Sequence, residues 1–304
     1  MDYMVDFSRL QVLRSIEQHG SVSAAARAMH LTPSAVSQQV RQLVADIGVE
    51  LLERDGRSTR LTPAAKILLS YAHRTAHSWE ETLGQLHAVD GGDHVSGELA
   101  VCSFATAIPA LVVPAAAALT ADAGGQATVT VREASTASSL ALLLQRTVDL
   151  AVIAAPANPE FDDPRFEQKP LTDDPQDLIV NAHSAFAELD TCTLAALARK
   201  AWIEPHPDQR ALIEAACTLD GFAPRFEHQA DDWNSVLALV RVGMGVCLYP
   251  RMAPINTPGV RRITLTGSNI PLRRVLTCVR AGSADQPLIA AFQARLLEQA
   301  APAH

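Results

Sequence analysis

The residues best suited to chemistry lie near the start of this sequence, on a segment that begins at Thr32-Pro33. Threonine is a favourable N-cap and proline suits the first helical position, so a helix is expected to begin here. Its apolar residues recur with helical spacing and form one buried stripe: Val36, Val40, Leu43 and Ile47. The opposite face carries small, uncharged or basic residues: Pro33, Ser34, Ser37, Gln38 and Arg41. Amides and hydroxyls can read base edges in the DNA major groove, and arginine can bind phosphate.

A shorter helix is expected just before this one and must position it. Ser23 is a possible cap for that helix, and the alanines at 24, 25, 26 and 28 allow another helix to pack closely. Two helices joined by a tight turn are typical of a helix-turn-helix DNA-binding motif. The alternative is an ordinary helical hairpin whose polar face is only solvated.

The segment after the helix pair favours DNA binding over that alternative. Asp55-Gly56 is a turn signal between two short runs, which predicts a β-hairpin wing. Arg54 at this wing is expected to bind phosphate, and Arg57 at its tip to enter the minor groove. Thr62-Pro63 then starts a long helix that is expected to run to about Val89. Its apolar stripe has near-heptad spacing, which is typical of a dimerising helix: Leu68, Ala72, Thr75, Trp79, Leu83 and Leu86.

This succession of features resembles the LysR-type transcriptional regulator family. The residues that carry the resemblance are Leu10 through Gly20-Ser21, Ser23, Ala25-Ala26, Thr32 to Ser37, Gln39-Val40, Leu43, Ile47-Gly48, Leu51, Arg54 and Leu61 to Pro63. The sequence departs from the family at Val44, Leu52 and Ala65, where Glu, Phe and Gly are usual. The resemblance implies base contacts from Pro33, Ser34, Ser37 and Gln38. It also implies an inverted repeat in promoter DNA, a dimer that can pair into a tetramer, and contact with RNA polymerase if the protein is an activator.

The distribution of charge agrees with a DNA-binding segment at the N-terminus. The 304 residues carry a net charge of −8, which is unusual for a DNA-binding protein. Residues 1–89 hold nine basic and nine acidic residues, so the whole excess of negative charge lies beyond them. Residues 27–74 have a local charge of +3. DNA affinity depends on local phosphate neutralisation, so the acidic total does not oppose this interpretation.

Beyond residue 90 the sequence alternates strand and helix patterns, which predicts open sheets covered by helices. Strands are expected at Gly97–Ser103, Ala127–Glu133 and Val148–Ala154, and later at Asp177–Asn181, Arg225–Gln229 and Leu272–Arg280. Among the helices expected between and after them are Leu194–Arg199 and the amphipathic Pro287–Ala300. This region also resembles the family, whose effector domain has two α/β lobes like periplasmic binding proteins. The matches are Gly97 to Val101, Val148 to Val152 and Gly243 to Pro250.

The expected architecture therefore has three parts. Residues 1–62 form a mostly α winged helix-turn-helix domain, and residues 63–90 form the linker helix. Residues 91–304 form an α/β, two-lobed effector domain like periplasmic binding proteins. Its first lobe is expected to hold about 97–171 and 272–304, and its second lobe about 172–271.

A small-molecule site is expected between the two lobes, because ligands of open α/β sheets bind at the carboxyl ends of strands. Residues from four segments are expected to meet there: Ser103, Phe104, Thr106, Ser135, Thr136, His206 and Trp233. Hydroxyls and helix N-termini suit a small carboxylate or an amino acid. The alternative is that the Ser and Thr residues only cap helices and that His206 and Trp233 only pack.

No catalytic or cofactor signature is found in the sequence, so the protein is not expected to be an enzyme. The five cysteines are dispersed without a C-x-x-C pair, and buried structural thiols are expected. His73 and His77 have the i, i+4 spacing of a metal clamp, but no third ligand is near. Neither a signal peptide nor a membrane span is found, and a cytoplasmic location is expected. The alternative functions are an effector-independent regulator or a solute-binding protein, and the latter would need an export signal.

Overall fold

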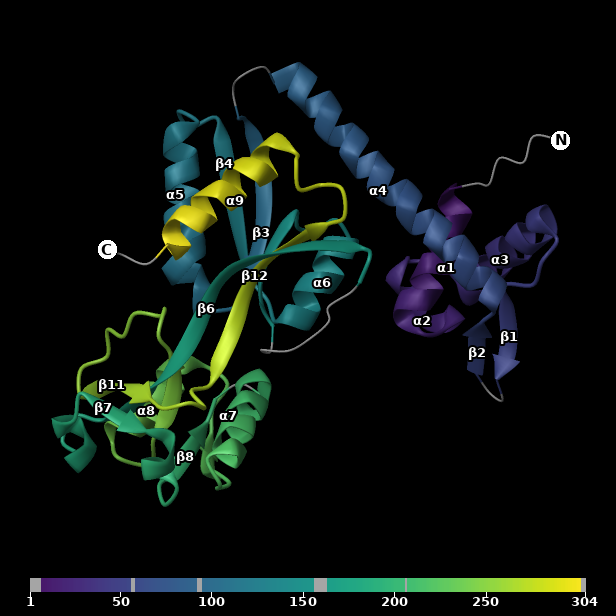
Figure 1. The fold of residues 1–304 in the computed structure, drawn as a ribbon. Coiled ribbons are helices and arrows are strands. Elements are labelled where there is room, and N and C mark those ends of the chain that lie inside the picture. Colours follow the sequence, from purple (N-terminus) through teal and green to yellow (C-terminus); the bar gives the residue numbers. More distant parts are fainter. Residues whose placement is uncertain (1–6, 56–57, 92–94, 156–162, 206, 302–304) are drawn as a thin grey trace. The chain divides into compact units, whose positions relative to one another are not determined.

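The computed structural model describes residues 7–55, 58–91, 95–155, 163–205 and 207–301 (Figure 1). The chain divides into two compact units, and the division falls inside the long helix α4, between Leu83 and Gly84. Each unit has its own hydrophobic cores. The two units are therefore described separately.

The first unit is a helical domain with a small β-hairpin. Its elements are α1 (Phe7–His19), α2 (Val22–Ala28), α3 (Pro33–Ile47), β1 (Leu52–Asp55), β2 (Ser58–Leu61) and the first part of α4 (Pro63–Gly91). The core packs α1 and α3 against the start of α4 through Leu13, Leu43 and Leu69. The cap of α2 differs from the expectation for Ser23: the side chain of Ser21 accepts the Ala24 N–H, because the helix begins two residues earlier than expected.

The second unit is built on one long mixed sheet with the strand order β4-β3-β5-β12-β6-β11-β7, in which β10 also pairs with β6. The strands are β3 (Gly97–Ser103), β4 (Ala127–Glu133), β5 (Leu150–Ala155), β6 (Phe166–Asn181), β7 (Thr191–Thr193), β10 (Cys247–Pro250), β11 (Val260–Thr266) and β12 (Leu272–Arg280). A separate parallel pair is formed by β8 (Ala201–Glu204) and β9 (Arg225–Gln229).

Two lobes form around this sheet (Figure 1). In the first lobe, β3, β4 and β5 run parallel, and helices cover both faces. A core rich in Val and Leu lies beneath α5 (Val113–Asp122) and α9 (Pro287–Ala300). A second core lies beneath α6 (Thr136–Leu144). The second lobe has its own two cores, beneath α7 (Pro207–Leu219) and α8 (Trp233–Arg241).

The strand β6 passes from one lobe to the other. Its first part, up to Pro175, pairs with β12, and its last part, from Gln176, pairs with β10 and β11. The exchange of partners at Pro175 marks the hinge between the lobes. Here the Gln176 N–H donates to the Pro271 carbonyl, and the Arg251 N–H donates to the Pro175 carbonyl.

Several elements differ from the sequence expectations. The strand expected at Asp177–Asn181 begins at Phe166, eleven residues earlier, although its first part contains two prolines and several charges. The strands β7 and β11 were not anticipated. The helix expected at Leu194–Arg199 is only a short 3₁₀ turn over Leu194–Leu197.

Candidate functional site

The helix α3 begins as the Thr32-Pro33 signal predicts. The Thr32 hydroxyl oxygen accepts the Ala35 N–H at 3.2 Å, and Gly48 ends the helix in a left-handed conformation. Three apolar side chains on one stripe are buried: Val36, Val40 and Leu43. Because this stripe is buried, the opposite face of α3 is exposed to solvent.

The outward face of α3 holds the residues singled out for DNA binding. Pro33, Ser34, Gln38 and Arg41 are exposed, and Ser37 is half-buried. No described carboxylate pairs with Arg41, so its charge is available for an external anion. The nearby Asp46 carboxylate is instead held by Arg9 on α1 and by the Gln42 amide. The face therefore carries amides, hydroxyls and a positive charge.

The wing predicted after α3 is an antiparallel hairpin formed by β1 and β2. Arg54 lies on β1 opposite Thr59. Arg57, which was expected at the tip, lies outside the described residues. Arg60 forms an ion pair with Glu53 across the hairpin at 2.7 Å. Of the wing arginines, Arg60 is thus already bound within the chain.

In the second unit, the first predicted site segment follows β3 into a π-helical turn over Ile108–Val112. Ser103 is fully buried and its hydroxyl donates to the Phe104 carbonyl. Thr106 is also buried, with 4% exposure. The parallel pairing of β3, β4 and β5 brings their carboxyl ends to one edge of the sheet, next to this segment.

Arg273 on β12 joins this segment, and sequence reasoning did not find it. Its Nη2 donates to the Thr106 hydroxyl oxygen at 2.7 Å, and its guanidinium lies 4.4 Å from the centre of the Phe104 ring. Its Nε donates to Asp174 Oδ2 at 2.8 Å. Among the described residues, no acceptor bonds the third nitrogen, Nη1, and 10% of the side chain is exposed.

Burial acts on the charge of this pair. The Asp174 side chain has no exposed surface, and burial lowers the pKa of the Arg273 guanidinium, although the Asp174 carboxylate opposes that change. An arginine keeps its proton under such conditions, because its ordinary pKa is far above neutrality. The pair is therefore an ion pair in a largely dry setting, where electrostatic interactions are stronger than in water.

Ser135 and Thr136 lie at the same edge, but both hydroxyls have partners within the chain. Ser135 is the N-cap of α6 and accepts the Ser138 N–H. The Thr136 hydroxyl donates to the Ala154 carbonyl at 3.0 Å and accepts the Ala154 N–H at 3.3 Å. The structure thus places these residues beside the strand ends, where Ala134 donates to the Ser103 carbonyl, and neither hydroxyl is hydrogen-bonded to Arg273.

The predicted residues of the second lobe are Trp233 and His206, and His206 lies outside the described residues. Trp233 is the first residue of α8 and packs edge-on against Tyr249 at 4.6 Å between ring centres. Tyr249 is close enough to Arg262 and Arg273 for both to lower its pKa, against the larger effect of burial. Trp233 thus contacts Tyr249, whose ring centre also lies 5.5 Å from the Arg262 guanidinium.

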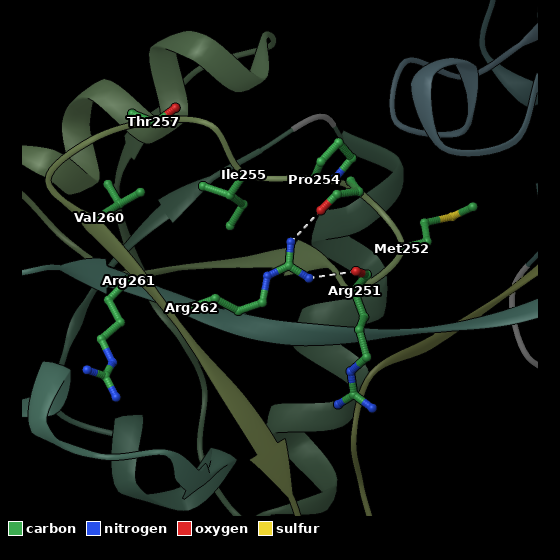
Figure 2. Close-up of a pocket in the computed structure, with 9 residues that line it drawn as sticks. Arg251, Met252, Pro254, Ile255, Thr257, Val260, Arg261 and Arg262 are labelled. Carbon is green, nitrogen blue, oxygen red and sulfur yellow. Dashed lines mark hydrogen bonds between the residues drawn. The ribbon is translucent and has the colours of Figure 1, made fainter. Parts of the chain in front are cut away.

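An open depression of about 560 Å³ lies at the loop between β10 and β11 (Figure 2). It is lined by residues 251–255, 257 and 260–262. Arg262 donates to the carbonyls of Pro250, Arg251 and Ala253, and Arg251 binds the buried Asp177 at 2.8 Å. Figure 2 shows Arg251 and Arg261 extending away from Ile255. The guanidinium groups of Arg251 and Arg262 thus hold the loop in place, whereas Arg261 pairs with Asp190.

Other chemistry is weakly represented among the described residues. All five cysteines are buried, and burial raises the pKa of Cys217 and of Cys278 to about 12. Thiols of this kind are poor nucleophiles near neutral pH. In the described part of the chain, no three His, Cys, Asp or Glu side chains gather as metal ligands. None of the described helices has the length and apolar character needed to span a membrane.

Comparison with known proteins assigns both units. The family model described as "Bacterial regulatory helix-turn-helix protein, lysR family" matches residues 7–66. A second, described as "LysR substrate binding domain", matches residues 92–301. The RuBisCO operon transcriptional regulator of Allochromatium vinosum is 28% identical over 307 residues, which cover 99% of this chain and 98% of that protein.

Solved structures agree in fold over nearly the whole length. Full-length CbnR in complex with its target DNA gives a TM-score of 0.58 at 23% identity and covers 97% of this chain and 100% of that one. HinK from Pseudomonas aeruginosa, a LysR family transcriptional regulator, gives 0.59 at 18% identity, with 97% and 99% covered. With a family model matching more than half of its length, the chain belongs to the LysR family of DNA-binding transcriptional regulators, with a substrate-binding domain after its helix-turn-helix domain.

Proposed function

We propose that this LysR-type regulator is controlled by a small carboxylate or an amino acid that binds between the two lobes of its second unit. The observation that carries this proposal is Arg273. It is a largely buried cation at the edge where β3, β4 and β5 end, and its Nη1 has no acceptor among the described residues. A buried guanidinium with an unused donor is well suited to a carboxylate.

The surroundings of Arg273 support a ligand of mixed character. Phe104 lies under the guanidinium. Tyr249 and Trp233, which pack on each other in the second lobe, are proposed to add two more aromatic rings. Thr106 supplies a hydroxyl beside the guanidinium. The carboxylate is proposed to bind Nη1, and the body of the ligand to contact the aromatic side chains. Ser103, Ser135, Thr136 and His206 complete the proposed site from the remaining segments.

DNA binding is proposed to proceed through the outward face of α3. Pro33, Ser34, Ser37 and Gln38 are proposed to contact base edges in the major groove. Arg41 and Arg54 are proposed to bind phosphates, and Arg57 to enter the minor groove. Two chains are proposed to pair through α4, so that two reading helices meet an inverted repeat. If the protein is an activator, RNA polymerase is a further partner.

The effector proposal is tested by a thermal-shift screen in which each carboxylate is paired with its neutral amide. Benzoate with benzamide and succinate with succinamide cover an aromatic and an aliphatic body, and free amino acids complete the panel. We expect a carboxylate to raise the melting temperature where its amide does not. Arg273→Gln should remove that shift, and Thr106→Ala with Ser135→Ala should reduce it. Full retention of the shift in these variants contradicts the proposed placement.

The regulator is separated from the alternatives by a gel shift with promoter DNA. The full chain should bind, and a chain lacking residues 1–62 should not. An effector-independent regulator would bind DNA in the same way with and without every compound that stabilises the protein. A solute-binding protein would bind its ligand but show no specific DNA complex at all.

A further inference from the structure

Four residues form a continuous polar connection across the hinge between the lobes. The Asp174 carboxylate, on β6, is its centre: Oδ2 accepts from Arg273 Nε at 2.8 Å, and Oδ1 accepts the Met252 N–H at 3.0 Å. Asp174 is one residue before Pro175, where β6 leaves β12 for β10 and β11. The carboxylate thus holds a backbone group of the second lobe at the turning point of the strand.

The other end of the connection reaches the first lobe. Arg273 Nη2 donates to the Thr106 hydroxyl oxygen at 2.7 Å, and Thr106 lies two residues before the π-helical turn that leads into α5. Arg273 lies directly opposite Asp174 in the register of β12 and β6. A single guanidinium therefore joins the first lobe to the crossover strand.

Packing follows the same path. Met252 comes from the loop after β10, in the second lobe, yet its side chain packs against the core beneath α5 and α9 in the first lobe. Its sulfur lies 3.9 Å from Arg273 Nη2. The next residue, Ala253, is buried in a core of the second lobe. Two successive residues, Met252 and Ala253, thus pack into the cores of different lobes.

The next acidic–basic pair on β6 and β12, Asp173 and Arg274, does not form such a connection. Asp173 and Arg274 are also opposite each other in the register, but both are exposed. Among the described residues, neither has an ion-pair partner. Two acidic–basic pairs stand side by side, and only the buried one is tied into both lobes.

We propose that Asp174, Arg273, Thr106 and Met252 form an inter-lobe latch that sets how the two lobes are held together. The proposal rests on the proposed function, because the same guanidinium offers Nη1 to the effector. A carboxylate bound there competes with Asp174 and Thr106 for the charge and position of Arg273. Effector binding then changes the hold on Met252 and the arrangement of the lobes, which is the two-state element that an effector needs.

The latch is tested without effector or DNA, by hydrogen–deuterium exchange of the full chain. Pro250 and Pro254 have no amide hydrogen, so a peptide covering this stretch reports only three amides: Arg251, Met252 and Ala253. Asp174→Asn replaces one of the two acceptor oxygens with an NH₂ group, which cannot accept from Arg273 Nε or from the Met252 N–H. We expect exchange of these amides to rise about tenfold or more, as for loss of a hydrogen bond to a charged group.

The decisive variant is Thr106→Val, which changes only the first-lobe end of the latch. Valine has a similar shape and no hydroxyl, and no hydrogen bond joins Thr106 to the three reporting amides. A latch predicts faster exchange at Arg251, Met252 and Ala253, by at least about threefold. Asp173→Asn is the matched control and should leave their exchange unchanged.

Three outcomes decide the proposal. Faster exchange at residues 251–253 in Thr106→Val supports it, provided that Asp173→Asn behaves like the parent. Changes confined to the residues around 106 overturn it, because the connection would then be local. Equal effects of Asp173→Asn and Asp174→Asn also overturn it, because a general charge effect would explain both. If Asp174→Asn fails to fold, Thr106→Val alone decides. Since no effector is added, failure of the effector proposal leaves this result intact.

Discussion

At the scale of single residues, the exposed amide of Gln38 is the sharpest test of DNA reading. Its side chain is exposed near the start of α3, and no described residue bonds it. We expect Gln38→Ala to weaken binding to the specific operator by about 1–3 kcal/mol and binding to random DNA much less. The reason is that one side-chain amide can form two hydrogen bonds with the edge of an adenine. Binding isotherms on both DNAs measure the difference.

Gln42 provides the matched control for that substitution. It lies one turn further along α3, and its amide already donates to Asp46 at 3.1 Å. Gln42→Ala should therefore change specific and random binding by similar, small amounts. Equal losses on both DNAs for Gln38→Ala would mean that Gln38 positions the protein without reading sequence.

The ion pair of Arg273 and Asp174 allows a prediction on stability. Removing one partner leaves the other charge buried without compensation, so Arg273→Gln should lower the free energy of unfolding by about 3–5 kcal/mol. Denaturant unfolding, followed by a signal from the second unit, measures this change in the free energy of unfolding. The exposed neighbour Arg274 is the control, and Arg274→Gln should stay within about 0.5 kcal/mol of the parent. Similar losses in both variants would show that burial of the pair contributes little.

Arg273 also shows why one part of the site could not be predicted from the sequence. A strand was predicted over Leu272–Arg280 and is present, but the pattern does not say which of its three arginines are buried. The partner, Asp174, is 99 residues away, in a segment with no recognised strand signal. Without the pairing of β6 with β12, nothing joins these charges. Phe104 and Thr106, by contrast, followed from their position at the end of a recognisable strand.

At the scale of elements, local patterns predicted those strands and helices whose stability comes from burial of regular apolar runs. The strands Gly97–Ser103 and Arg225–Gln229 and the helix Pro287–Ala300 have the expected bounds. The first part of β6 was missed because Pro170 and Pro175 remove backbone donors, which argues against an inner strand. It is a strand because long-range pairing with β12, which includes a register shift between Val275 and Leu276, outweighs local preference.

The long helix α4 shows a similar division. Of the predicted stripe, Ala72 is buried in the core of the first unit and Leu68 packs against it. Four large apolar residues of α4 are left exposed: Ile67, Tyr71, Trp79 and Leu86. Trp79, the largest of them, is 52% exposed. Exposed apolar side chains in helical register call for a partner, which supports the proposed pairing of two chains.

Trp79 is the residue by which that pairing is tested. Buried tryptophans often contribute 2 kcal/mol or more to an interface, so Trp79→Lys should weaken the dimer by about thirtyfold or more. Light scattering across a dilution series should detect a shift toward the chain mass of 32.5 kDa. Ser78→Lys adds the same charge at the adjacent exposed position and should leave the mass unchanged. Unchanged assembly of Trp79→Lys would place the interface elsewhere.

At the scale of the whole molecule, charge is divided between the two functions. The balanced first 89 residues hold the reading helix, and all of the net charge of −8 lies in the remainder. A net negative charge repels DNA phosphates, which supports the proposal that DNA contact is made by the first unit. The proposed effector site and the proposed latch both use an arginine of this acidic region, whose net negative charge disfavours binding of nucleic acid.

The last prediction follows from joining two reading helices through α4. A dimer with fixed separation between its reading helices requires two half-sites on the same face of the duplex, spaced by whole helical turns. Insertion of about five base pairs between the half-sites turns one of them to the opposite face, whereas insertion of about ten restores the face at a greater distance. We therefore expect the five-pair insertion to reduce affinity more than the ten-pair insertion, measured by gel shift at one salt concentration. Trp79→Lys should bind all three DNAs weakly and with little difference among them, because its reading helices act singly. If the parent chain also binds all three DNAs with similar affinity, its two reading helices are not held at a fixed separation.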